Sequence, residues 1–170
     1  MYKVFTLFLC LFISIVLYSQ KEYSLEYQHG FGKKYNSNSI GGLYEGFSNT
    51  GKSSWQVGIH YTFDVFYSDK TTQGVSGLGL SAGYRYGFSY GNSGNLITGI
   101  RATLSFIGEK DHSKFTPSIE FGYHYTFNNF GKGGFTTPSL NVGYDIPMGN
   151  ESGDYEGFLF IPRIAVGYRF

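Results

Sequence analysis

The chain has 170 residues and a formal net charge of +1, aromatic residues make up 20% of it, and 25 positions are glycine. A chain so close to neutral, without a basic patch or stripe, is a poor candidate for binding nucleic acid. Beyond the first twenty residues no apolar run approaches the ~18 residues of a membrane-spanning helix, which excludes a second helical span.

The first residues have the pattern of a secretory signal peptide. Met1-Tyr-Lys3 is a short positive start, and a mainly apolar stretch runs from Val4 to Tyr18. Roughly 15 residues are fewer than the ~20 that a helix needs to span a bilayer. We therefore expect residues 1–19 to be removed by cleavage after Ser19, leaving one domain over 20–170. Because the only cysteine lies in this leader, neither disulfides nor thiol chemistry are expected in the mature chain.

Apolar and polar residues alternate with a period of two along the mature chain. Gly, Asn, Ser, Asp and Lys fill the gaps between the alternating runs. This pattern predicts β-strands joined by turns. We expect eight strands, over residues 22–31, 38–47, 54–66, 76–90, 95–107, 114–127, 135–147 and 158–170. The first two are the least regular, since Gly41, Gly42 and Gly46 interrupt the alternation.

The last of these strands has two clearly different faces. Phe158, Phe160 and Ile164 belong to an apolar face, and Arg163 and Arg169 belong to the opposite face. This division is typical of a strand with lipid on one side and a polar barrel lumen on the other. Strands cross a membrane only as a closed barrel, because every backbone donor and acceptor in the hydrocarbon must be paired. The sequence therefore predicts an all-β fold, an eight-stranded antiparallel up-and-down transmembrane β-barrel.

The closing residues Arg163-Ile-Ala-Val-Gly-Tyr-Arg-Phe170 resemble the terminal signal by which bacterial outer-membrane barrels are recognised for insertion, with Ala165 where glycine is usual. Together with the leader and the strands, they make the whole mature chain resemble the small outer-membrane β-barrel family of Gram-negative bacteria. The resemblance implies an outer-membrane location, periplasmic termini and contact with outer-membrane lipid. It also implies insertion by the barrel-assembly machinery, with Tyr168 and Phe170 as the insertion signal.

Ionisable residues fall on the faces expected to point into the lumen. They are Arg85, Arg101, Glu120, Asp64, Asp145 and Arg163, with Glu26, Glu45, His60 and His124 on the same faces. Hairpin geometry predicts that Arg85 and Arg101 lie at the same height on neighbouring strands, with Glu120 opposite Arg101. An eight-stranded barrel is only wide enough for side chains to fill, and charges there must be paired. We expect a closed network of ion pairs; a proton or ion path along the same residues is the less favoured alternative.

Two segments, 58–66 and 122–130, share the triplet His-Tyr-Thr. They are similar to the His-x-Ser pair of outer-membrane lipid A deacylases, with Thr62 or Thr126 in place of the serine. Lipid chemistry needs these groups on the outer surface, whereas His60 and His124 are expected to point inward. No clustered metal-ligand motif, phosphate loop or paired-carboxylate site is evident, so we expect no cofactor.

The predicted function is that of a closed, non-enzymatic barrel. It would serve envelope integrity or act as a small subunit of a larger outer-membrane complex. The alternatives are a lipid A-modifying barrel enzyme and a soluble secreted barrel like a lipocalin, in which the aromatic faces would form a packed core. Uniformly large outward faces, opposed by faces rich in Gly, Ser and Thr, favour the membrane barrel.

Overall fold

The computed structural model describes residues 20–32, 35–48, 50–67, 75–90, 93–107, 112–128, 131–148 and 156–170. The expected signal peptide, residues 1–19, lies outside the described residues. Within the ranges given, no helix is long and apolar enough to cross a membrane.

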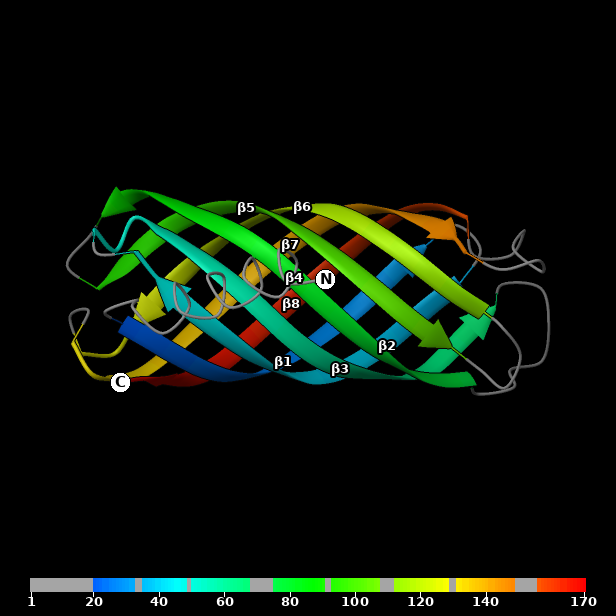
Figure 1. Ribbon diagram of the computed structural model, residues 1–170, viewed down its shortest axis with the longest axis horizontal. Helices are drawn as coiled ribbons and strands as arrows, with labels where there is room; N and C mark the ends of the chain where they lie inside the picture. Colours follow the sequence, from blue (N-terminus) through cyan, green and yellow to red (C-terminus); the bar gives the residue numbers. More distant parts are fainter. Residues whose placement is uncertain are drawn as a thin grey trace, which may run out of the picture.

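Eight strands form one antiparallel sheet that closes on itself (Figure 1). They are β1 (Gln20–Gly32), β2 (Tyr35–Phe47), β3 (Ser53–Tyr67), β4 (Val75–Tyr90), β5 (Gly94–Ile107), β6 (His112–Thr126), β7 (Gly133–Pro147) and β8 (Gly157–Arg169). Each strand pairs with its sequence neighbours, and β1 pairs with β8 to complete the ring. The predicted eight-stranded antiparallel up-and-down barrel is confirmed, and each strand overlaps its predicted range.

The strands run obliquely across the long axis of the barrel, as closure of a sheet requires (Figure 1). One end of the barrel, here called the terminal end, holds Gln20 and Phe170, and Phe170 lies beside Lys21 where the β1–β8 pairing ends. The other end, called the distal end, holds Gly32, Pro147 and Gly157.

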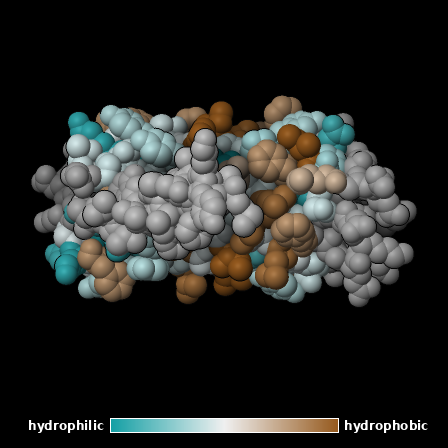
Figure 2. Space-filling model, in the orientation of Figure 1, coloured by the Kyte–Doolittle hydropathy of each residue, from teal (hydrophilic) through white to brown (hydrophobic). Residues whose placement is uncertain are grey.

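The alternation in sequence gives the barrel an apolar outside and a polar inside. Leu25, Ile100 and Phe158 are each exposed by more than 60%, whereas Glu120 and Asp145 are exposed by 1% or less. Figure 2 shows hydrophobic side chains gathered over the middle of the barrel and hydrophilic ones toward its ends. The described aromatic residues are mostly exposed, the reverse of the packed aromatic core of a soluble barrel.

Three prolines within strands interrupt the hydrogen-bond ladders, because proline has no N–H to donate. The β6–β7 ladder breaks at Pro117, opposite Tyr144, and again at Pro138. The β1–β8 ladder breaks at Pro162, opposite His29. On the other side of β6, the pairing with β5 runs through Pro117 without a gap. The missing bond at Pro117 therefore belongs to the β6–β7 seam.

Candidate functional site in the barrel lumen

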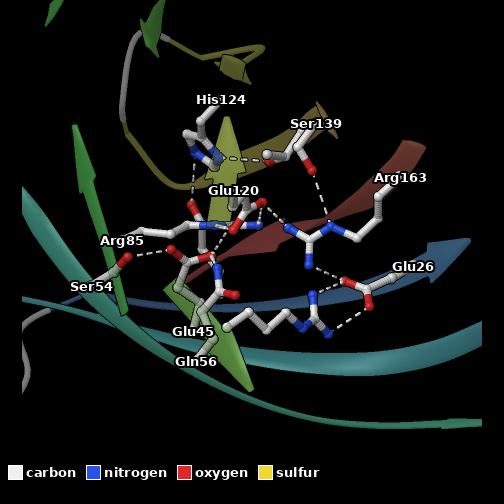
Figure 3. Close-up of polar contacts among 12 residues, drawn as sticks. Glu26, Glu45, Ser54, Gln56, Arg85, Glu120, His124, Ser139 and Arg163 are labelled. Carbon is white, nitrogen blue, oxygen red and sulfur yellow. Dashed lines mark hydrogen bonds and ion pairs between the residues drawn. The ribbon is translucent and has the colours of Figure 1, made fainter. Parts of the chain in front are cut away.

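Three arginines and three glutamates occupy the middle of the lumen and form one connected chain of ion pairs (Figure 3). We call this chain the central network; in order, its members are Glu45, Arg85, Glu120, Arg163, Glu26 and Arg101. Their formal charges cancel. None of the six residues is exposed by more than 4%. Charges buried this deeply are tolerated only where every one is paired and hydrogen-bonded.

Arg85 joins the first half of the central network. Its Nη1 donates to Glu45 Oε2 at 2.6 Å, while its Nε and Nη2 donate to the two oxygens of Glu120 at 2.9 and 2.7 Å. Two parallel bonds between a guanidinium and a carboxylate form the strongest geometry for such a pair. Ser54 and Gln56 also donate hydrogen bonds to the carboxylate of Glu45 (Figure 3).

The second half of the network crosses to the opposite wall of the barrel. Arg163 donates to Glu120 and, from Nη1, to Glu26 Oε2 at 2.9 Å. Glu26 also accepts from both terminal nitrogens of Arg101, at 2.7 and 3.1 Å. Ser139 accepts from Arg163, and Ser81 accepts from Arg101. Glu120 and Glu26 are therefore each shared by two arginines.

A glycine on β5 makes the contact between Arg85 and Glu120 possible. Gly99 lies in register with Arg85 on one side and with Glu120 on the other. A Cβ atom at this position would lie 2.5 Å from the Tyr84 carbonyl oxygen and 3.2 Å from Cγ of Arg85. Because Gly99 has no side chain, Arg85 can lie across β5 and reach the next strand.

The predicted partners of Arg101 are wrong by two residues of register. Arg101 faces Gly83 on β4 and Ser118 on β6, where the sequence-based pairing placed Arg85 and Glu120. On the β4 side, the turn already places Tyr90 opposite Asn95, one residue from the predicted register, and the shift between Gly87 and Ser89 displaces all pairs beyond it by one more. Arg101 therefore binds Glu26, and the second arginine bound to Glu120 is Arg163.

A second cluster lies toward the distal end and contains the predicted residue Asp145. Its carboxylate binds Nζ of Lys114 at 2.8 Å and accepts a hydrogen bond from Thr116. Lys114 was not predicted as a member of this network. It alternates in phase with Thr116 and Glu120, and this alternation indicates that it points into the lumen. The side chain of Asp64, the remaining predicted member, lies outside the described residues.

A third cluster lies at the terminal end. Arg169 Nε donates to Glu22 Oε1 at 2.6 Å, and His124 Nε2 lies 3.3 Å from the same oxygen. The guanidinium of Arg169 also lies over the Phe47 ring, 4.8 Å from its centroid. Sequence reasoning placed Arg169 on the inward face but did not include it or Glu22 in a network. Glu22 alternates in phase with Glu26, and this alternation alone could have predicted that Glu22 points into the lumen.

Small polar spaces remain on both sides of the central network. On the distal side, a cavity of about 40 Å³ is bordered by Arg101, His60 and Asn141, with the Lys114–Asp145 pair. On the terminal side, Glu45, Arg85 and His124 border one of about 10 Å³. A single water needs roughly 10–15 Å³. The distal cavity therefore has room for a few waters, and the terminal cavity has room for about one.

Both His-Tyr-Thr segments place their histidine and threonine inside the lumen, as expected. His60, Thr62, His124 and Thr126 are each exposed by 5% or less. Thr62 exchanges a hydrogen bond with Ser39 at 2.9 Å, and His124 Nδ1 lies 2.8 Å from the Thr137 hydroxyl. In the part of the chain that is described, no group of three His, Cys, Asp or Glu side chains is arranged to hold a metal ion.

The predicted insertion signal lies on the outward face at the terminal end. Tyr168 and Phe170 are both exposed, and their ring centroids are 5.0 Å apart. The Phe170 N–H donates to the Lys21 carbonyl at 3.0 Å. Recognition of this aromatic pair by an assembly machinery stays a prediction.

Comparisons with known proteins identify no family for this chain. No model of a known protein family matches the sequence, and a search of curated proteins finds no significant match.

Proposed function

We propose that this chain is a closed, non-enzymatic β-barrel that spans the outer membrane of a Gram-negative bacterium with its termini in the periplasm. Its role is structural, either in the integrity of the cell envelope or as a small subunit of a larger outer-membrane complex. One observation carries the proposal: the barrel has an apolar, aromatic outside and a charge-neutral ion-pair network sealed inside.

The outside of the barrel supports the membrane location. Soluble monomers rarely expose contiguous apolar patches larger than a few hundred Å². Here large apolar side chains are exposed on every strand, from Leu25 on β1 to Val166 on β8. The strands contain 13 to 16 residues, which exceeds the ~9–11 needed to cross a bilayer at a tilt. Closure of the sheet also leaves no edge strand exposed to lipid.

The inside of the barrel supports a closed lumen. An eight-stranded barrel has an interior that side chains can fill, and here the central network places three arginines across it. Each arginine is held by at least two acceptors, so none can swing aside without breaking several charge-assisted hydrogen bonds in the buried lumen. Such a lumen excludes solutes and stiffens the wall.

The position of the two His-Tyr-Thr segments supports a non-enzymatic role. A lipid A deacylase would need its histidine and nucleophile on the lipid-facing surface. Both pairs lie in the lumen instead, and Thr62 and His124 already have hydrogen-bond partners there. These residues therefore fit the packing of the lumen better than catalysis on lipid.

Membrane insertion and the absence of lipid chemistry can be tested together. We expect the protein to co-sediment with outer membranes and, in detergent, to migrate differently on a gel with and without boiling. Lipid A from cells with and without the protein should have the same mass spectrum. A single gel band under both conditions would contradict the membrane barrel, and a new lipid A mass would contradict the non-enzymatic role.

A further inference from the structure

The outward face carries an open hollow of about 900 Å³ that extends from the middle of the barrel toward its distal end, across β4 to β8. Its floor is made by small residues in register, since Ala82 pairs with Ala102 and Ala102 pairs with Pro117. Aromatic rings of Tyr84, Phe121 and other residues border it. The side chain of Arg101 points away from the hollow into the lumen, where it binds Glu26. The hollow is therefore an apolar depression in the surface.

One backbone group in this depression lacks its ladder partner. Pro117 and Tyr144 both line the hollow, and they face each other where the β6–β7 ladder is broken. Pro117 has no N–H, so the Tyr144 carbonyl receives no ladder hydrogen bond from it. A carbonyl in hydrocarbon has no water to bind and needs a donor from elsewhere. The hollow thus combines a large apolar volume with a backbone carbonyl whose ladder donor is missing.

The depth of this acceptor limits which donor can reach it. Tyr144 lies three residues from Pro147, the last residue of β7 at the distal end. In a barrel with periplasmic termini, this end meets the outer leaflet. A donor at that depth belongs to the part of a lipid just below its head group, because the lower part of an acyl chain lies deeper in the hydrocarbon.

We propose that the hollow binds an outer-leaflet lipid whose acyl chain carries a hydroxyl close to the head group. The chain lies over Ala82, Ala102 and Pro117, and the hydroxyl donates to the Tyr144 carbonyl. An unsubstituted chain fills the same volume but leaves the carbonyl unpaired. The inference rests on the proposed function, because the hollow faces lipid only in a barrel that spans the membrane.

Native mass spectrometry from nanodiscs tests this site. The probes are phosphatidylethanolamine with one 3-hydroxyacyl chain and the same lipid without the hydroxyl, in equal amounts. A net hydrogen bond predicts that the protein retains the hydroxylated lipid about threefold to tenfold more often. Pro117→Ala supplies an N–H to the Tyr144 carbonyl and should bring this ratio close to one while lipid is still retained.

Two further variants make the test specific. Pro162→Ala repairs the corresponding break in the β1–β8 ladder, away from the hollow, and should leave the preference unchanged. Ala102→Phe fills the floor of the hollow and should abolish retention of both lipids. Folding of this variant is judged by its migration on a gel without boiling. If it does not fold, Ala82→Leu serves as the variant that fills the floor.

Equal retention of both lipids by the parent protein would overturn the inference, as would loss of the preference in Pro162→Ala. A dimer in place of a lipid-bound monomer would assign the hollow to a second copy and also overturn it. Failure of the barrel to enter nanodiscs would instead refute the proposed function and the inference together. An inserted barrel without a lipid preference would refute the inference alone.

Discussion

The central network and the distal cluster are both built from buried ion pairs, but the pairs are connected differently. In the distal cluster the described residues form a single pair, between Asp145 and Lys114 near the mouth of the barrel. In the central network Glu120 and Glu26 are each held by two arginines, and all six charges depend on one another. Removal of a shared carboxylate therefore leaves two buried arginines short of a partner, whereas removal of Asp145 breaks the described pair with Lys114.

This difference indicates where the stability of the lumen is concentrated. Lys114 has a flexible stem whose ammonium group can turn toward water at the distal mouth. Arg163 has no such route, because its side chain is fully buried at the middle of the barrel. The following substitutions test this contrast, in order of expected effect.

Glu120→Ala should have the largest effect. It leaves Arg85 and Arg163 without their shared carboxylate and should lower the free energy of unfolding by about 3–5 kcal/mol. Urea unfolding in lipid vesicles measures this change. Unfolding at the parent's urea concentration would show that Glu120 is not buried between the two arginines.

Gly99→Ala should come next, because its Cβ would lie 2.5 Å from the Tyr84 carbonyl and crowd Arg85. Overpacking of this kind typically costs about 1–3 kcal/mol. Gly42→Ala is the matched control, since a Cβ there meets nothing within 4 Å. The same unfolding assay compares them, and equal stabilities would contradict the proposed role of Gly99 in letting Arg85 cross β5.

Asp145→Asn should have a smaller effect than Glu120→Ala. The amide keeps the volume and can still accept from Thr116, while Lys114 turns toward the mouth of the barrel. We expect a loss of about 1–2 kcal/mol in the free energy of unfolding. A loss as large as that of Glu120→Ala would show that the distal cluster is as tightly coupled as the central network.

The double variant Glu45→Leu/Arg85→Met should have the smallest effect. It removes one charge of each sign from the end of the network, and the other four charges stay paired through Glu120 and Glu26. Replacement of a complete buried pair by apolar residues is often nearly neutral, so we expect a change below about 1 kcal/mol. Each single variant should cost more than the double variant, and additive losses would argue against coupling between the two residues.

The strands, and the face of the sheet on which each side chain lies, were predictable because apolar and polar residues alternate in the sequence with a period of two. The inward placement of Arg85, Arg101, Glu120 and Arg163 followed from phase alone. The loss of alternation at Gly41 and Gly42 also had little consequence, since β2 is held in place by its neighbours on both sides.

Ion-pair partners were not predictable to the same degree. Hairpin counting assumed a regular ladder between β4 and β5, but the register shifts between Gly87 and Ser89. The contact of Arg101 with Glu26 also joins strands on opposite walls, and neighbour pairing carries no information about contacts across the lumen. Side-chain length and the closed geometry of the barrel decide those contacts.

Single-channel recording tests most directly whether the central network closes the lumen. Purified protein in planar bilayers at moderate salt should show no stable channels, because Arg85, Arg163 and Arg101 form ion pairs across the lumen and the spaces beside them have room for only a few waters. Glu120→Ala should add at most brief, small openings. Reproducible, long-lived conductance steps from the unmodified protein would contradict a sealed lumen and favour an ion path along these charges.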